Sequence, residues 1–256
     1  MTNRQMRHLC NELRRCFNKS EKFFKKVDFE GGNRRHQMIS GYAVRTLDLL
    51  SGSISTLSKK EYVSVPTVTR ACVEAFLLFV NLIVHENYES LIILHVKKER
   101  KRALENALII EDIEQFADRE VLSGYIDATQ REIDDLAEHM GDYNELCASV
   151  KKRFYAAGMG QLYLSLYNLF CGESHSDFIA VEGGNLIGEA QEISFARRNT
   201  PTRDILLYVH VLLDLLVAIP VRLNAFLELG EDEEINSIVA RIEEAKALYD
   251  LPEDHM

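Results

Sequence analysis

The stretch PTVTRACVEAFLLFVNLIVHE, residues 66–86, is apolar on nearly every side when it is drawn as a helix. Pro66 suits the first helical position, and Ser64 is placed to cap the helix. A helix that is apolar nearly all round is usually buried inside a larger core. The stretch therefore predicts a central core helix.

A second apolar run, ILLYVHVLLDLLVAIPV, lies inside a helix predicted over residues 201–229. Its seventeen residues are fewer than the roughly 20 that a membrane-spanning helix needs. It also contains Pro220 and the ionisable residues His210 and Asp214, which are costly within a bilayer. The run predicts a second core helix, and no membrane partner is expected.

The remaining sequence is also helical in pattern, because only four prolines and thirteen glycines interrupt 256 residues. Further helices are predicted over residues 3–27, 34–57, 88–108, 111–139 and 231–248, and residues 144–157 and 160–173 are expected to form one helix or two. The fold class is therefore all-α, a multi-helix bundle of about seven or eight helices, with one irregular loop near 178–199. We expect a single domain over residues 1–256, in which a basic N-terminal helical extension (1–33) and an acidic C-terminal helix (231–256) flank a core at about 38–226.

Charge is distributed unevenly along the chain. The net charge of −10 argues against nucleic-acid binding by the whole protein. Residues 1–60 contain thirteen Lys and Arg against five Asp and Glu, whereas residues 223–256 contain two against ten. These opposite charges predict that the two terminal helices pack together. A basic N-terminal face that binds phosphate is the alternative interpretation.

Five scattered cysteines without C-x-x-C spacing indicate neither a disulfide framework nor a zinc site. Free thiols fit a reducing compartment, and the first residues, MTNRQMRHLCNELRRCF, lack the apolar segment of a signal peptide. A cytoplasmic location is expected. No metal ion or cofactor is predicted, because no phosphate-binding glycine loop or E-x-x-H pair occurs in the sequence.

Polar residues with chemical capability interrupt two of the predicted helices. Arg70 and Glu74 are four residues apart on the first core helix and therefore share a face. Tyr167, Cys171 and His175 repeat the same spacing on a later helix. Buried charges need partners. We therefore predict a buried polar cluster of Arg70, Glu74, Tyr167 and His175, which either fixes the helix packing or forms a cleft.

The pair R-x-x-x-E and the later segment Y-x-x-x-C-x-x-x-H resemble motifs of domain-of-unknown-function family 5677, a group of all-helical bacterial proteins. The resemblance covers about residues 38–226. The family pattern usually has serine where this chain has Cys171. A thiol is a weak hydrogen-bond donor and favours a packing role at this position.

Two function classes remain open, and the sequence leaves open whether the protein is an enzyme. The first is a binding, regulatory or interaction module that acts on a protein partner or as a homo-oligomer. The second is a metal-independent ribonuclease that resembles the HEPN type, of toxin or defence kind. The ribonuclease would use an Arg/His pair. In the predicted cluster, with Tyr167 beside it, Arg70 could hold a phosphate, His175 could act as general acid or base, and Glu74 could orient either. Arg203 and His210 fit the spacing of the HEPN signature and are the second candidate pair.

Overall fold

The computed structural model describes residues 2–110, 118–138, 140, 149–167, 170–171, 186–187, 192–193 and 202–249. The protein is an all-α multi-helix bundle, as the sequence predicts. Its chain divides into two compact units, Met1–Ile83 with Gln161–Met256, and Val84–Gly160. The organisation as a single domain stays a prediction.

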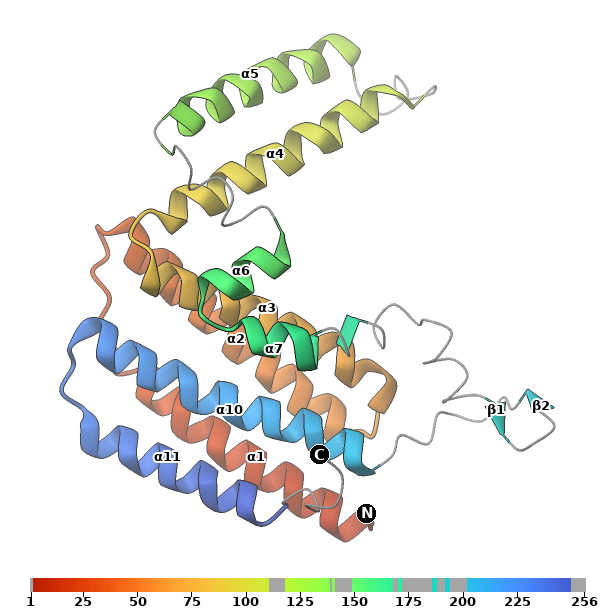
Figure 1. The fold of residues 1–256 in the computed structure, drawn as a ribbon, viewed down its shortest axis with the longest axis vertical. Helices are drawn as coiled ribbons and strands as arrows, with labels where there is room; N and C mark the ends of the chain where they lie inside the picture. The colour runs from red at the N-terminus through yellow and green to blue at the C-terminus, as the bar shows by residue number, and fades with distance from the viewer. Residues whose placement is uncertain are drawn as a thin grey trace. The chain divides into compact units, whose positions relative to one another are not determined.

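The first unit contains most of the helices. They are α1 (Asn3–Phe24), α2 (Arg34–Ser58), the 3-10 turn η1 (Tyr62–Ser64), α3 (Val65–Val84), α7 (Gly160–Leu162), the π-helical segment η4 (Tyr163–Tyr167), α10 (Thr202–Leu227) and α11 (Asp232–Ala247). Helix α1 packs against α2, α10 and α11, and α10 also packs against α11 (Figure 1).

Helices α3 and α10 supply much of the core of this unit, which confirms that both apolar runs form core helices. Phe79 and Leu82 of α3 and Leu212 and Leu216 of α10 are fully buried. Helix α3 begins at Val65, whose φ of −60° and ψ of −46° already continue the preceding turn into the helix. Ser64 belongs to that turn, so its predicted role as the cap of α3 is wrong.

The C-terminal end of α3 is capped by a side chain from α2. Arg35 donates its Nε to the carbonyl of Leu82 at 2.7 Å and its Nη2 to the carbonyl of Ile83 at 2.8 Å. The last carbonyls of a helix have no partner within the helix, and a cation there also suits the helix dipole. The contact therefore fixes the start of α2 against the end of α3.

The terminal helices pack together, as their opposite charges predict. Lys26, just after α1, pairs with Glu234 of α11 at 2.5 Å, and Lys19 of α1 donates to the carbonyl of Ser237 at 2.5 Å. Leu9, Leu13 and Cys16 of α1 are buried. Apolar burial is the main source of stability at this contact, since exposed ion pairs contribute little.

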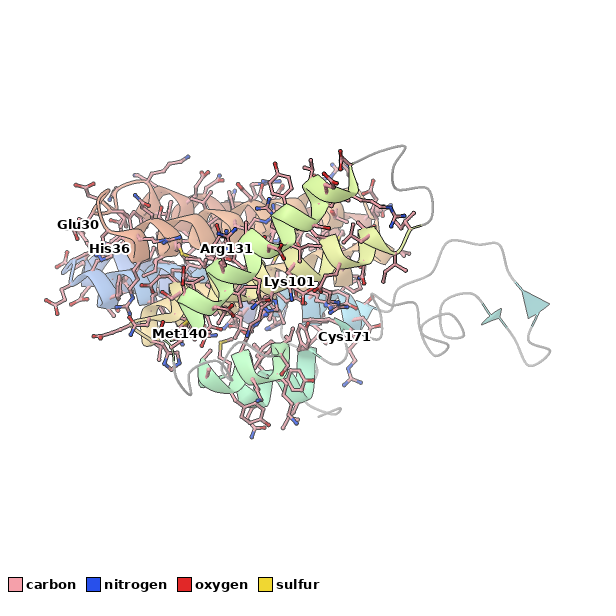
Figure 2. The ribbon with its side chains drawn as sticks, turned by 90° about the horizontal axis from the view of Figure 1, so that it is seen from above. Glu30, His36, Lys101, Arg131, Met140 and Cys171 are labelled. Atoms are coloured by element: carbon pink, nitrogen blue, oxygen red, sulfur yellow. The ribbon has the colours of Figure 1, made fainter. Side chains whose placement is uncertain are left out.

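The second unit is an antiparallel helical hairpin of α4 (Tyr88–Leu108) and α5 (Arg119–Glu138), together with the short α6 (Val150–Ala156) (Figure 1). Its buried side chains include Tyr88, Leu91 and Phe154. Lys101, in the charged run of α4, pairs with Glu105 one turn later. Figure 2 labels Lys101 on α4 and Arg131 on α5. The helix predicted over 111–139 begins at Arg119 within the described residues.

The predicted irregular loop contains two short strands, β1 (Leu186–Ile187) and β2 (Glu192–Ile193). They pair antiparallel, with Leu186 opposite Ile193. The other residues of the 178–199 loop lie outside the described residues.

Two of the described helical segments, Tyr62–Val84 and Thr202–Leu227, are long and apolar enough to cross a membrane. The core helix of a soluble protein passes the same test, so this is weak evidence, and 56% and 61% of their apolar windows are buried inside the protein. On α10, Asp214 is 64% exposed and pairs with Lys246 of α11 at 2.7 Å. A solvated ion pair on this face suits a helix packed in a globular core.

Candidate functional site

Arg70 and Glu74 form an ion pair on α3. The Nε of Arg70 lies 2.8 Å from Oε1 of Glu74, as the four-residue spacing predicts. Their side chains are 25% and 38% exposed, respectively. The pair is therefore half-buried, and it lies at the edge of the core rather than within it.

Tyr167 joins this pair from a distant part of the sequence. Its hydroxyl donates to Oε1 of Glu74 at 2.5 Å, and its ring lies 5.5 Å from the guanidinium carbon of Arg70. Tyr163 stacks on Tyr167 with 5.6 Å between the ring centroids. The structure thus brings three of the four predicted cluster residues together, and we call Arg70, Glu74 and Tyr167 the polar cluster.

The local backbone determines which side chains reach the cluster. Gly158 has a φ of 71°, which favours glycine and ends α6. After α7 the chain becomes a π-helix over Tyr163–Tyr167, with hydrogen bonds to the fifth residue instead of the fourth. Tyr163 and Tyr167 are four residues apart and still share a face of this segment, as their stacked rings show. Single π-helical turns often occur at functional sites.

Electrostatics favour a neutral Tyr167 and a charged Arg70. Burial, followed by the hydrogen bond to Glu74 and its negative charge, raises the pKa of Tyr167 well above its usual range. Burial acts to lower the pKa of Arg70, but its hydrogen bonds to Glu74 and Tyr167 outweigh that effect and leave the pKa raised. The cluster therefore carries one cation and one anion at neutral pH.

Cys171 and His175 are the other two residues that the sequence places on one helix face with Tyr167. Cys171 is half-buried and close enough to contribute to the raised pKa of Tyr167. His175 lies outside the described residues, so its predicted place in the cluster stays a prediction.

The cluster is more exposed than the sequence predicts. Its apolar neighbours along α3 suggested full burial, whereas both charged side chains reach solvent. Long charged side chains can cover apolar surface with their stems and keep their charged ends in water. This arrangement avoids much of the desolvation cost of a buried ion pair.

The second predicted pair, Arg203 and His210, lies on α10. Arg203 is exposed and His210 is half-buried. Nε2 of His210 lies 3.3 Å from the carbonyl oxygen of Tyr249, which follows α11. Tyr249 therefore lies against His210, one of the two candidate histidines of the ribonuclease hypothesis.

In the described ranges, no three side chains of His, Cys, Asp or Glu come together to hold a metal ion. His85 and Glu89 have the four-residue spacing of a possible ligand pair, but Nε2 of His85 lies 3.0 Å from the carbonyl oxygen of Ala156.

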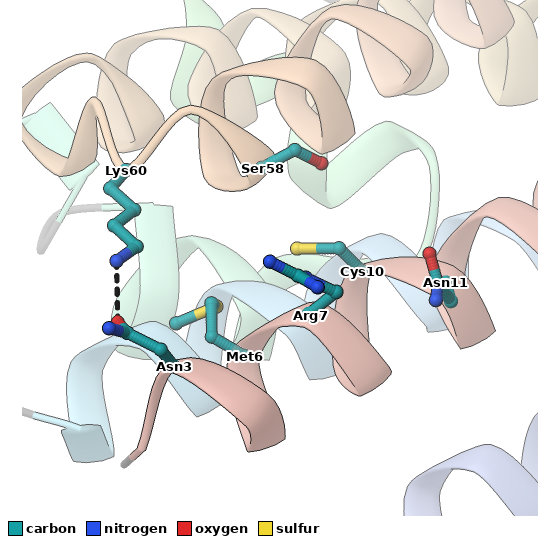
Figure 3. A pocket seen from close by; sticks show the side chains of 7 residues that line it. All are labelled: Asn3, Met6, Arg7, Cys10, Asn11, Ser58 and Lys60. Carbon is teal, nitrogen blue, oxygen red and sulfur yellow. Dashed lines mark hydrogen bonds between the residues drawn. The ribbon is translucent and has the colours of Figure 1, made fainter.

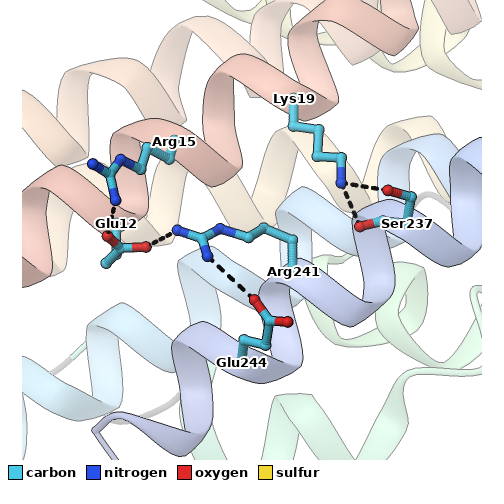
Figure 4. Close-up of polar contacts among 6 residues, drawn as sticks. All are labelled: Glu12, Arg15, Lys19, Ser237, Arg241 and Glu244. Atoms are coloured by element: carbon cyan, nitrogen blue, oxygen red, sulfur yellow. Dashed lines mark hydrogen bonds and ion pairs between the residues drawn. The ribbon is translucent and has the colours of Figure 1, made fainter.

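Sequence reasoning missed a buried charged network between the terminal helices. Glu12 of α1 pairs with Arg15 at 2.6 Å and with Arg241 of α11, which also contacts Glu244 at 3.2 Å (Figure 4). The Glu12 side chain is only 5% exposed. A sequence signal did exist, because Glu12 is the only acidic residue among the first twenty.

The fold and the site define an all-α helical protein with a half-buried Arg–Glu–Tyr cluster at the edge of its core. The chain belongs to the family of unknown function DUF5677, whose model matches residues 36–192. The match includes the polar cluster and excludes α1, α10 and α11, so it ends earlier than the resemblance over 38–226 implies. No curated protein and no solved structure matches this chain.

Proposed function

We propose that this protein is a binding module that contacts a partner protein through Arg70, Glu74 and Tyr163, a set that we call the Arg70 surface. The observation that carries the proposal is that Arg70 is held in one position by Glu74 and Tyr167 while a quarter of its side chain stays exposed. A partly exposed arginine that is already ordered loses little rotamer entropy on binding.

The composition of the Arg70 surface also supports protein recognition. Arginine and tyrosine are enriched among the residues that contribute most to protein–protein binding. The guanidinium provides planar donors and the Glu74 carboxylate provides acceptors, which together match polar groups of a protein surface. The adjacent Leu164 is 53% exposed and offers an apolar contact on the same segment.

The balanced charge of the polar cluster favours a protein partner over a strongly charged ligand such as phosphate or RNA. Arg70 and Glu74 neutralise each other at 2.8 Å, so a phosphate would compete with an existing carboxylate for the guanidinium. A partner with balanced polar groups avoids that competition. The same consideration gives this cluster no advantage for RNA binding or cleavage.

We further propose that the protein acts in the cytoplasm. Cys10, Cys16 and Cys72 are buried thiols that form no disulfide, which suits a reducing compartment. The burial of more than half of each apolar window supports the view that both candidate spans are core helices.

Site-specific photo-crosslinking in cells tests the protein-binding proposal. A photoreactive phenylalanine analogue at Leu164 should form a covalent adduct with one defined protein. The same analogue at Val44, which is 40% exposed on α2, is the matched control and should not form it. Arg70→Ala should weaken the interaction by roughly 2 kcal/mol, about 30-fold, as for other central interface residues.

The outcomes distinguish the candidate functions. An adduct of twice the chain mass would identify a second copy as the partner. Identical adducts at both positions, or adducts that are indifferent to Arg70→Ala, would contradict the proposal. The ribonuclease alternative is tested with structured and single-stranded RNA, and cleavage that His175→Ala or His210→Ala abolishes would replace protein binding as the function.

A further inference from the structure

A pocket of about 270 Å³ lies between α1 and the end of α2, separate from the Arg70 surface. The described residues that line it are Asn3, Met6, Arg7, Cys10 and Asn11 from α1, with Ser58 and Lys60 from the end of α2 (Figure 3). Two cationic side chains therefore approach it from different segments, Arg7 from α1 and Lys60 from the turn that follows α2.

The lining is positive and rich in hydrogen-bonding groups. It includes two cations and, among the residues that the structure describes, no carboxylate. Lys60 donates to Oδ1 of Asn3 at 2.5 Å, which leaves the amide nitrogen of Asn3 as its donor. Ser58 donates its hydroxyl proton to the carbonyl of Ile54 at 2.7 Å, so Asn3 and Asn11 are the neutral side chains that can donate to a ligand.

Lys60 occupies an unusual backbone conformation for a lysine. Its φ is 62°, in the left-handed region where glycine is favoured after a helix. Such residues are strained, and strained residues cluster at ligand sites and other functional positions. Here the strained position directs a cation to the rim of a pocket that contains a second cation.

We propose that this pocket binds a small phosphate-bearing molecule. A phosphate carries close to two negative charges and several acceptor oxygens, which match two cations and two amide donors. The volume lies just below the roughly 300–1,000 Å³ of drug-sized ligand sites, so it suits a phosphate monoester with a small organic group. Met6 and Cys10 provide an apolar contact for that group.

Continuous nucleic acid fits these observations less well. Its backbone would require a row of cations, whereas the lining provides two. The net charge of −10 also opposes long polyanions. This binding function goes beyond protein recognition at the Arg70 surface and does not depend on it.

Thermal unfolding of the full chain with added ligands tests the proposal. Inorganic phosphate and a ribonucleoside monophosphate are each compared with chloride at equal ionic strength. At about 100 times the dissociation constant, the midpoint should rise by roughly 5–10 °C for a protein of this size. No rise with either ligand, relative to chloride, overturns the proposal.

Variants assign the effect to the pocket. Arg7→Ser and Lys60→Gly should each weaken binding at least about tenfold, as expected for the loss of a charged hydrogen bond. Lys60→Gly removes the backbone strain, so the ligand-free midpoint should stay level or rise and the variant remains folded. Arg4→Ser is the matched control, because Arg4 is exposed on the same helix and does not line the pocket.

A ligand response that both pocket variants retain would place the phosphate elsewhere and overturn the assignment. Binding of a single-stranded oligonucleotide that both variants abolish, with no response to the mononucleotide, would replace the small-molecule ligand with nucleic acid. Arg70→Ala should leave the ligand response unchanged, which separates this proposal from the protein-binding function.

Discussion

Tyr167 donates its hydroxyl proton to the Glu74 carboxylate at 2.5 Å, across 93 residues of sequence. This contact attaches the π-helical segment to α3 and holds the aromatic ring beside Arg70. It also makes the protonation state of one tyrosine depend on folding, because burial and the neighbouring carboxylate raise the pKa of Tyr167.

That pKa shift predicts a pH dependence of stability. A tyrosine titrates near pH 10 in the unfolded chain and at higher pH in the folded protein. Its contribution to stability is therefore fully present below about pH 10 and is lost as the pH rises further. Above pH 10 the free energy of unfolding of the wild type should fall more steeply than that of Tyr167→Phe, by up to about 1.4 kcal/mol per pH unit.

Urea unfolding at pH 9, 10 and 11 measures this difference. Burial is the main cause that also raises the pKa values of Tyr62 and Tyr249. Both proteins contain these two tyrosines, so only the difference in unfolding free energy between the wild type and Tyr167→Phe reports on Tyr167. Parallel curves for the wild type and Tyr167→Phe would show that the hydrogen bond to Glu74 does not persist in solution.

The exposure of the Arg70–Glu74 pair predicts a small effect of mutation on stability. Removal of one member of a fully buried pair costs roughly 3–5 kcal/mol. Here the two side chains are 25% and 38% exposed, so solvent screens the interaction and Arg70→Ala should cost about 1 kcal/mol. The thermal midpoint should fall by about 2–4 °C.

Arg45→Ala, at an exposed position on α2, is the control for general loss of charge. A fall on the order of 10 °C for Arg70→Ala alone would instead identify the cluster as structural scaffolding, and would weaken the case for a recognition surface.

The sequence predicts the helical elements well because the signals that begin and end helices are local. The two long apolar runs located α3 and α10, and the turn around Gly31 and Gly32 separates α1 from α2 close to the predicted residues. The 3-10 turn before α3 and the π-helix at Tyr163–Tyr167 have no such local signal. Neighbouring side chains and chain connections decide these irregularities, and apolar spacing does not encode them.

The candidate site was predictable in part for the same reason. The Arg70–Glu74 contact follows from spacing along one helix. The contact between Tyr167 and Glu74 depends on how two distant segments pack. The sequence indicated Tyr167 as a partner of the Arg70–Glu74 pair because buried charges need partners. The excess of Lys and Arg in residues 1–60 indicated a basic face, but it did not locate the pocket beside Lys60, because a lysine does not signal a left-handed backbone as a glycine would.

The network around Glu12 predicts unequal effects of its two arginines. Glu12 is buried, whereas Arg241 is 31% exposed and Arg15 is 68% exposed. Arg241→Ala removes the less exposed partner, leaves a buried carboxylate poorly compensated and should cost roughly 3 kcal/mol. Arg15→Ala removes a largely solvated partner and should cost less than about 1 kcal/mol.

Urea unfolding of both variants, and of each combined with Glu12→Gln, measures the coupling. The neutral amide removes the uncompensated charge, so Glu12→Gln should recover part of the stability that Arg241→Ala loses. Equal costs for the two arginines would contradict a network centred on the contact between α1 and α11.

Burial also predicts which cysteines react with alkylating reagents. It raises the pKa of Cys16 to about 11 and that of Cys72 to about 12, despite opposing contributions from Arg241 and Ser53, respectively. The thiolate is the reactive form, and near pH 8 it is a fraction of about one in a thousand or less at such pKa values. Both thiols are also enclosed, whereas Cys171 is partly exposed beside the polar cluster.

Under native conditions, iodoacetamide should therefore modify Cys171 at least about 100-fold faster than Cys16 or Cys72, as peptide mapping by mass spectrometry would measure. Equal rates at the three positions in the folded protein would mean that the core around α1 and α3 opens readily, and denaturation in urea should equalise them.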